Sequence, residues 1–454
     1  MKIVIAGAGT VGGAIAAQLA GEGHDITLID RDADTIAALS GKLDVICVEG
    51  SASVPSVLEE AGVPGADLLI AATEYDEVNM ICGIAARRLG AKHVIARVRD
   101  PQYREDAEFF CETLGLGMLF NPEFECAMEI SRVLRFPGAT RVDAFSKGTI
   151  EIAEHRVKKG ETLDGLALKD LRSRLHARVL VSLVEREDEA FIPNGDFVIR
   201  EGDRLSVSGG AGELKKFFTW AGAYAKPVKR AFLSGGNRTA VYLAKALTEA
   251  GIGVLILEKD PERCRQLCGI VPEAVVVCAD ATQSSVLEEE GFGPEDAFVA
   301  LTPYDGDNII TAAYAKSLGA AKSVARIDRE DLLKILPASE TDGAILTRDA
   351  SVSKVTAYVR ALSNSMESGS IETMYYLAGG RAEALEFIVG KDVWFAGRQL
   401  RDLRFAKGTL VAAVIRGRNF LIPEGETHLL PGDHAVIVCP SGQVKRIEDA
   451  VIHP

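Results

Sequence analysis

The chain has 454 residues, of which 26% are charged and 47% hydrophobic, proportions typical of a folded globular protein and not of a disordered one. Its 65 Asp and Glu residues outnumber its 51 Lys and Arg residues, giving a formal net charge of -14, which disfavours nucleic acid or anionic lipid as the main partner. No apolar run approaches the ~20 residues of a membrane-spanning helix, so we expect a cytoplasmic protein without direct membrane insertion.

Residues 1–138 are predicted to form a parallel-sheet domain. Short β-rich runs alternate here with longer helical stretches, a pattern typical of βαβ units whose sheet is covered by helices on both faces. The predicted strands are residues 2–6, 25–29, 45–48, 68–72 and 93–98.

A glycine-rich turn follows the first predicted strand and opens a predicted helix. It reads Gly7-Ala8-Gly9-Thr10-Val11-Gly12, and Asp30 ends the next strand. This context indicates a dinucleotide site, with the phosphates at the helix N-terminus and the ribose hydroxyls on the acid. Asp30 disfavours a 2′-phosphate and hence NADP, although the neighbouring Arg31 makes that exclusion less strict.

Further candidate ligand contacts lie at the carboxyl ends of later predicted strands, because ligands of open α/β sheets bind at that edge. Ser51 and Thr73 are suited to hydrogen-bond a ribose or phosphate, but both are equally common in turns and helix caps. Arg97 lies in an apolar strand and needs a charged partner, which a bound phosphate or an internal carboxylate would supply.

Residues 139–222 are predicted to form a small α+β module. They combine short alternating strands with turn signals such as Pro193-Asn194-Gly195 and with one short helix predicted over residues 163–171. Residues 223–230 contain proline and basic residues and are predicted to be an exposed linker.

The chain then repeats once. The segment from Ile5 matches the segment from Leu233 at a spacing of 228, and the segment from Ile192 matches that from Ile422 at a spacing of 230. We therefore expect a second parallel-sheet domain over residues 231–365 and a second α+β module over residues 366–454. The length alone suggests about three domains, and the repeat raises this to four.

The second copy has a changed turn. Gly9 is replaced by Asn237 and Gly12 by Ala240, so the dinucleotide pattern is degraded. The residues retained at this turn are compatible with two alternatives. The second domain binds a nucleotide in a different pose, or it is a vestigial scaffold that binds none. The candidate contacts of this second site are Gly235, Gly236, Asn237, Arg238, Thr239, Glu258, Asp280 and Thr302.

Catalytic groups are not evident. A dehydrogenase needs a side chain that exchanges a proton with its substrate, yet no tyrosine is followed four residues later by lysine and no metal-ligand spacing of histidines is found. The sequence therefore predicts binding without reaction, with no metal and no catalytic residue. A cytoplasmic NAD-dependent oxidoreductase stays an alternative, because catalytic residues can converge in space.

Several segments resemble the regulator-of-potassium-conductance (RCK) family. GAGTVGG at Gly7, EGSASVPSVLEEAG at Glu49, ATEYDEVNM at Ala72, IARVRDPQY at Ile95 and NPEFECAMEISRVLRFPGA at Asn121 resemble its N-terminal domain. IPNGDFVIREGDRLSV and IPEGETHLLPGDHAVIV resemble its C-terminal domain. The resemblance implies an α/β protein with two Rossmann-like, doubly wound parallel-sheet domains, each followed by a small α+β RCK C-terminal domain.

The resemblance also implies a nucleotide-binding regulator of potassium uptake. The implied ligand is NAD(H), with ATP or ADP as a further candidate. The chain would assemble with three further copies as a homotetrameric ring, and its implied partner is a potassium-conducting membrane subunit. A freestanding nucleotide sensor with a soluble partner is a rival. A helix over residues 125–136 would pack across a subunit boundary, as in the family, or within its own domain. The implied ligand contacts are Gly7, Ala8, Gly9, Thr10, Val11, Asp30, Ser51, Ala52, Thr73, Glu74 and Arg97.

Overall fold

The computed structural model describes residues 1–136, 138–145, 149–187, 189–222, 228–333, 343–365, 371–417 and 419–453. They form two parallel and two antiparallel sheets in the alternating order that the repeat predicts. Of the predicted linker, residues 223–227 lie outside the described residues, as do residues 366–370 at the start of the last predicted module. Within the described ranges, no helix combines the length and apolar character needed to cross a membrane.

The first parallel sheet has the strand order β3-β2-β1-β4-β5-β6. The five predicted strands are confirmed to within one residue, and the short β6 was not predicted. The order reverses between β1 and β4, the point beside which ligands of such sheets bind. The strands are β1 (Lys2–Ala6), β2 (Asp25–Asp30), β3 (Ile46–Glu49), β4 (Leu68–Ala71), β5 (His93–Arg97) and β6 (Met118–Phe120). The helices are α1 (Thr10–Gly21), α2 (Ala33–Ser40), α3 (Pro55–Glu60), α4 (Asp76–Leu89), α5 (Pro101–Glu105), α6 (Ala107–Leu114) and α7 (Pro122–Arg135).

The first antiparallel sheet has the order β10-β9-β11-β8-β7. The helix predicted at residues 163–171 is misplaced, because Gly165 adopts a left-handed conformation (φ +81°) that ends any helix there. The elements of this module are β7 (Arg141–Phe145), β8 (Ile150–Arg156), α8 (Leu168–Arg174), β9 (Val179–Arg186), β10 (Glu189–Phe191), β11 (Arg204–Gly209) and α9 (Ala211–Ala221).

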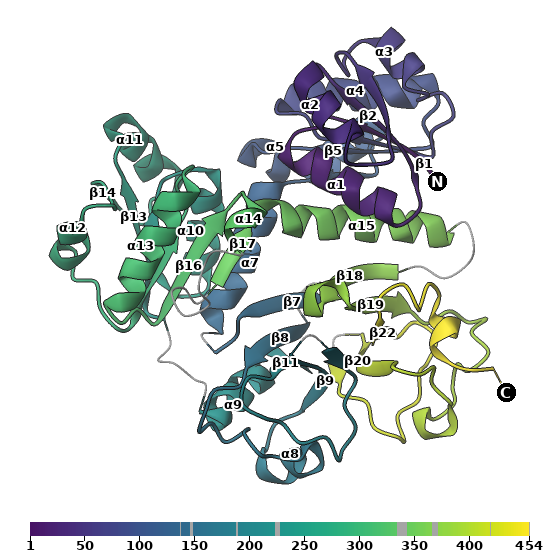
Figure 1. The fold of residues 1–454 in the computed structure, drawn as a ribbon, viewed down its shortest axis with the longest axis vertical. Helices are drawn as coiled ribbons and strands as arrows, with labels where there is room; N and C mark the ends of the chain where they lie inside the picture. Colours follow the sequence, from purple (N-terminus) through teal and green to yellow (C-terminus); the bar gives the residue numbers. More distant parts are fainter. Residues whose placement is uncertain are drawn as a thin grey trace.

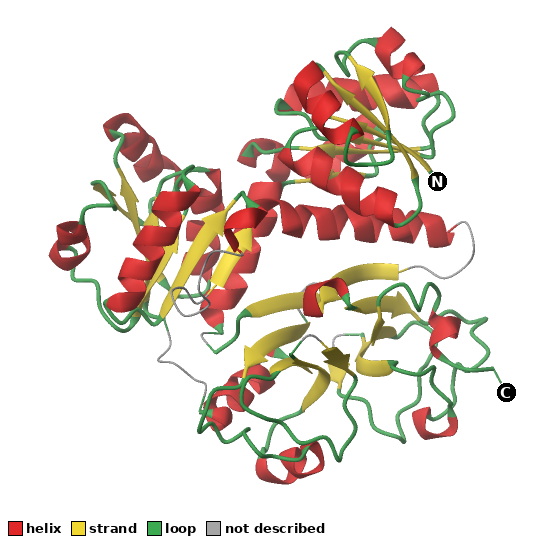
Figure 2. Ribbon diagram, in the orientation of Figure 1, coloured by secondary structure: helices red, strands yellow, loops and turns green. Residues whose placement is uncertain are grey.

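The second half repeats both sheets with the same strand connections. Its parallel-sheet domain contains β12 (Arg230–Ser234), α10 (Arg238–Glu249), β13 (Gly253–Glu258), α11 (Pro261–Ile270), β14 (Val275–Cys278), α12 (Ser284–Glu289), β15 (Asp296–Ala300), α13 (Asp305–Ser317), β16 (Lys322–Ile327), α14 (Glu330–Leu333), β17 (Gly343–Leu346) and α15 (Thr347–Ser365). Its antiparallel sheet contains β18 (Ile371–Leu377), β19 (Ala382–Ile388), β20 (Leu410–Arg416), β21 (Asn419–Leu421) and β22 (His434–Pro440). Figure 2 shows helices covering the strands of both parallel-sheet domains, whereas strands and loops make up most of the two antiparallel modules.

The last helix of each parallel-sheet domain packs against the other half of the chain. In α7, Ile130 and Leu134 join the core of the second parallel-sheet domain, and in α15, Val355 and Val359 join the core of the first. Figure 1 shows α15 running from the second parallel-sheet domain beneath the first. The helix predicted at residues 125–136 thus crosses a boundary, but one inside the chain, between its two tandem copies.

The two antiparallel modules, each with its own core, also share an apolar cluster between them. Phe145 and Ile152 of the first module pack in a cluster with Ala384 and Val436 of the second. A hydrogen bond from the Tyr375 hydroxyl to the Ala144 carbonyl oxygen (3.0 Å) joins the facing edges. The halves are therefore connected both through the crossing helices and through these modules.

Candidate functional site

The glycine-rich turn between β1 and α1 forms an open cradle. Gly7 has φ +101°, and a Cβ added there would lie 2.7 Å from the Ala72 carbonyl oxygen. A Cβ at Gly12 would lie 1.9 Å from the Gly7 carbonyl oxygen, so both positions require glycine. A Cβ at Gly9 would meet no atom within 4 Å. The space above Gly9, at the N-terminus of α1, is therefore open to an anionic group.

Asp30 fixes this turn against the end of β2. Its Oδ2 atom accepts a hydrogen bond from the Ala8 amide (2.6 Å) and its Oδ1 atom accepts one from the Asp32 amide (3.0 Å). Asp32 in turn caps α2 by accepting hydrogen bonds from Asp34 and Thr35. Each Asp30 oxygen retains a lone pair that can accept a hydrogen bond from a ribose hydroxyl.

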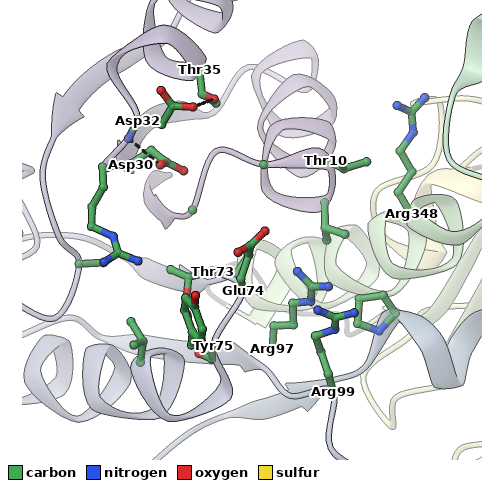
Figure 3. Close-up of a pocket in the computed structure, with 18 of the residues that line it drawn as sticks. Thr10, Asp30, Asp32, Thr35, Thr73, Glu74, Tyr75, Arg97, Arg99 and Arg348 are labelled. Atoms are coloured by element: carbon green, nitrogen blue, oxygen red, sulfur yellow. Dashed lines mark hydrogen bonds between the residues drawn. The ribbon is translucent and has the colours of Figure 1, made fainter. Parts of the chain in front are cut away.

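A cavity of about 740 Å³ lies above the turn. Figure 3 shows side chains from several strand ends surrounding it, with Glu74 and Arg97 reaching inward. Of the predicted first-site residues, only Ala8 is absent from its lining, and Ala8 lines an adjoining cavity of about 830 Å³ beside α1. The predicted residues that line the main cavity are Gly7, Gly9, Thr10, Val11, Asp30, Ser51, Ala52, Thr73, Glu74 and Arg97. Lining residues that were not among the predicted contacts include Arg31, Asp32, Thr35, Tyr75, Arg99, Glu123, Arg326, Asp328, Thr347 and Arg348.

A buried asparagine holds the ends of β4 and β5 together. Asn79 accepts hydrogen bonds from the Thr73 amide and hydroxyl (2.8 and 2.6 Å) and donates to the Arg97 carbonyl oxygen (3.0 Å). Asn308 makes the same contacts with Thr302 and Arg326 in the second half. The sequence contained a signal for this role, because both asparagines lie in the repeated segment that begins with these threonines.

Arg97 lies beside the cavity, with its side chain 13% exposed and with an incomplete set of partners. Its Nη2 atom lies 3.8 Å from Glu123 Oε1, which makes a shorter contact of 2.5 Å with Arg99 Nε. Burial lowers the pKa of Arg97, and the charge of Glu123 offsets only part of this effect. The Nε atom of Arg97 has no hydrogen-bond partner among the described residues. An anionic ligand would supply that partner.

The second half of the chain completes the wall of this cavity. Arg326, which corresponds to Arg97, donates to Thr347 (2.8 Å) and to Asp328 (2.6 Å) and so has the internal partners that Arg97 lacks. Arg348, at the start of α15, also lines the cavity and lies 3.6 Å from Asp349. A ligand in the first site would therefore contact both halves.

In the corresponding turn of the second half, a side chain bridges the position that is open above Gly9. Asn237 donates to the Leu301 carbonyl oxygen (2.5 Å) and accepts from the Ala240 amide (3.0 Å). Glu258 accepts from the Gly236 amide (2.7 Å), as Asp30 does from the Ala8 amide in the first half. A Cβ at Gly236 would lie 2.4 Å from the Leu267 side chain. The predicted second-site residues Gly235, Gly236, Asn237, Arg238, Thr239, Glu258, Asp280 and Thr302 line neither of the two cavities described above.

Two domain-family models match the chain. The TrkA-N domain matches residues 3–122 and 232–347, and the TrkA-C domain matches residues 152–222 and 384–451. A Trk system potassium uptake protein TrkA homolog of Archaeoglobus fulgidus is 33% identical over 450 residues, covering 99% of each chain. The Trk system potassium uptake protein TrkA of Vibrio alginolyticus is 31% identical over 461 residues, covering 100% of this chain and 99% of that protein.

Solved structures share the fold. The GsuK RCK domain matches with a TM-score of 0.62 at 20% identity, covering 97% of this chain and 92% of that one. The GsuK channel bound to NAD matches with a TM-score of 0.61 at 20% identity, covering 97% of this chain and 77% of that one. The tandem α/β architecture predicted from the sequence is thereby confirmed.

Proposed function

Because the chain belongs to the TrkA family of Trk-system potassium uptake proteins, we propose that it is a nucleotide-binding regulatory subunit that controls a membrane potassium-conducting subunit. One observation carries this proposal: the cavity above the intact glycine turn is walled by residues of both halves. A ligand that contacts both halves favours one arrangement of them over another, and a partner protein can sense the difference without any chemical step.

The proposed ligand is NAD(H). Asp30 would accept hydrogen bonds from the adenosine ribose, the N-terminus of α1 would hold the pyrophosphate, and Arg97 would contact a polar group beyond it. The open space above Gly9 and the unpartnered Nε atom of Arg97 fit such a ligand. The NAD-bound form of the GsuK channel supports this assignment by shared fold. ATP or ADP would present the same adenosine and phosphate groups and is a further candidate.

We expect the ligand to be bound and not turned over. Hydride transfer to a substrate needs a nearby proton donor or acceptor. The described residues that line the cavity include no histidine, lysine or cysteine, so an enzyme would have to use its carboxylates or Tyr75 for that step. Steady oxidation of NADH by the purified chain with a small substrate would instead support the oxidoreductase alternative.

We further propose that the chain assembles as a homotetramer. Ile81 on α4 and Ile310 on α13 occupy corresponding positions and are 51% and 68% exposed. Exposed apolar side chains on equivalent helices favour contact with further copies. Native mass spectrometry should show a tetramer for the wild type and smaller species for Ile81→Asp with Ile310→Asp. The control Ile452→Asp, at a 45% exposed position near the C-terminus, should remain tetrameric.

The proposed location is the cytoplasmic face of the cell membrane, held there by a TrkH-like potassium-conducting subunit. Affinity purification from detergent-solubilised membranes should recover that subunit with the chain. Recovery of only soluble partners would favour the freestanding sensor.

Isothermal titration tests the nucleotide site. NADH should bind wild type and the control variant Gly212→Glu. A Cβ at either Gly9 or Gly212 meets no atom within 4 Å, and Gly212 is an exposed position of α9, outside the cavity. Gly9→Glu should lose binding, because its carboxylate would occupy the phosphate position. Equal binding by all three chains would exclude the turn as the site.

A further inference from the structure

The C-terminal end of α1 is held by a buried ionic cluster. Arg360 of α15 donates two hydrogen bonds to the carboxylate of Glu22, from Nε (2.9 Å) and Nη2 (3.0 Å). Its Nη1 atom donates to Glu383 (2.8 Å), and the Tyr376 hydroxyl donates to Glu22 (2.6 Å). We call Glu22, Arg360, Tyr376 and Glu383 the α1 clamp.

The α1 clamp joins three parts of the molecule. Glu22 caps α1 in the first parallel-sheet domain, Arg360 belongs to the crossing helix α15, and Tyr376 and Glu383 belong to β18 and β19 of the second antiparallel module. The Glu22, Arg360 and Glu383 side chains are only 15%, 18% and 0% exposed. A bidentate ion pair shielded from water fixes geometry more strongly than an exposed pair does.

The other half of the chain contains only part of this arrangement. Arg135 occupies the position of Arg360 in α7, Glu151 occupies that of Glu383 in β8, and these two side chains pair at 3.2 Å. The residue that corresponds to Glu22 at the end of α10 is Ala250, which has no carboxylate. The intact glycine turn and the complete clamp therefore lie at opposite ends of the same helix, and the helix with the degraded turn lacks the clamp.

We propose that the α1 clamp transmits nucleotide occupancy of the first site to the second antiparallel module, an inference that rests on the proposed function. Helix α1 has 12 residues and spans about 18 Å from the phosphate cradle to Glu22. A displacement of its N-terminus by a ligand moves Glu22, and through Arg360 it moves Glu383 and the strand that carries it. Because Ala250 at the end of α10 has no carboxylate, the described residues give the second turn no equivalent connection.

Hydrogen–deuterium exchange of the full-length chain with and without NADH tests this inference. In the wild type, NADH should slow exchange in the glycine turn and alter exchange in β18 and β19. Arg360→Met should keep the first effect and lose the second. Arg135→Met is the matched control, because it removes the equivalent arginine of the incomplete cluster, and it should keep both effects.

Three outcomes are decisive. A response in β18 and β19 that persists in Arg360→Met overturns the inference, as does a wild type in which NADH protects the turn without changing these strands. No NADH effect at the wild-type turn instead overturns the proposed function. Because Arg360→Met leaves Glu383 buried without its partner, Glu22→Gln is the second variant, and it should lose the response of the two strands while retaining protection of the turn.

Discussion

Asn237 donates a hydrogen bond from Nδ2 to the carbonyl oxygen of Leu301 at 2.5 Å, bridging the turn after β12 to the end of β15. Gly9 and Ala72 hold the equivalent positions in the first half, where no side chain bridges the gap. The two copies thus have the same backbone plan but differ in access to the crevice. A dinucleotide in the second half would have to displace the Asn237 amide, whereas the first site is open.

We therefore predict one tight NADH site per chain and a second site that opens on substitution. Asn237→Gly removes the bridging amide and should add a second, weaker binding event in calorimetry. This substitution should lower the free energy of unfolding only slightly, because replacing an N-cap asparagine by glycine costs about a few tenths of a kcal/mol. Two equal sites in the wild-type chain would contradict this asymmetry.

Arg97 should contribute directly to nucleotide affinity. Arg97→Met removes a cation with an unpartnered Nε atom, while Glu123 keeps its shorter contact with Arg99. A hydrogen bond to a charged group contributes about 1.5–3 kcal/mol, so the Kd for NADH should rise between about tenfold and about a hundredfold. The control Arg329→Met removes an exposed arginine paired with Asp331 and should leave the Kd unchanged. Equal effects of the two substitutions would argue against a ligand contact by Arg97.

Most of the fold could be predicted from the sequence, because parallel strands buried on both faces form continuous apolar runs such as that of β4. The three-residue β6 was missed because it is too short to show a pattern. The helix predicted at residues 163–171 was misplaced because Leu163 and Leu166 are buried in a turn and not on a helical face.

Tyr242 of α10 should stabilise the contact between the two halves of the chain. Its hydroxyl accepts a hydrogen bond from Asn121 (2.9 Å) and donates one to the Arg99 carbonyl oxygen (3.3 Å). Burial raises the pKa of Tyr242 to about 12, so the hydroxyl stays protonated at neutral pH. Tyr242→Phe should lower the free energy of unfolding by about 1 kcal/mol in denaturant titration. Tyr304→Phe, at a 61% exposed position, should have no measurable effect, and similar losses in both variants would exclude a specific role.

The α1 clamp should weaken in acid. Burial alone would raise the pKa of Glu22, but the hydrogen bonds and charge of Arg360, with hydrogen bonds from Tyr376 and Gln18, outweigh it and lower the pKa. A carboxyl group with a lowered pKa stabilises the folded state fully above its unfolded pKa of about 4.3, and this contribution is lost as the pH falls through the folded pKa. Wild type should therefore be more stable than Glu22→Gln at neutral pH, and the difference should shrink below about pH 4.3. A difference independent of pH would show that the Glu22 charge has no role.

The sequence could predict only those residues of the candidate site that the local backbone, a turn or a strand end, places there. The glycine turn, Asp30 and the strand ends meet this condition, since parallel strands bring their carboxyl ends to one edge. Arg348 and Thr347 could not be predicted, because they reach the cavity only through the packing of α15 on the first domain. A tertiary contact between residues so distant in the chain leaves no local sequence pattern.

Potassium uptake by cells that lack this chain tests the central claim most directly. Uptake should be restored by the wild type and by Gly212→Glu, and it should stay impaired or lose its regulation with Gly9→Glu combined with Asp30→Arg, two changes confined to the first nucleotide site. Normal potassium uptake in the absence of the chain, or full rescue by the double variant, would contradict a nucleotide-responsive role in potassium transport.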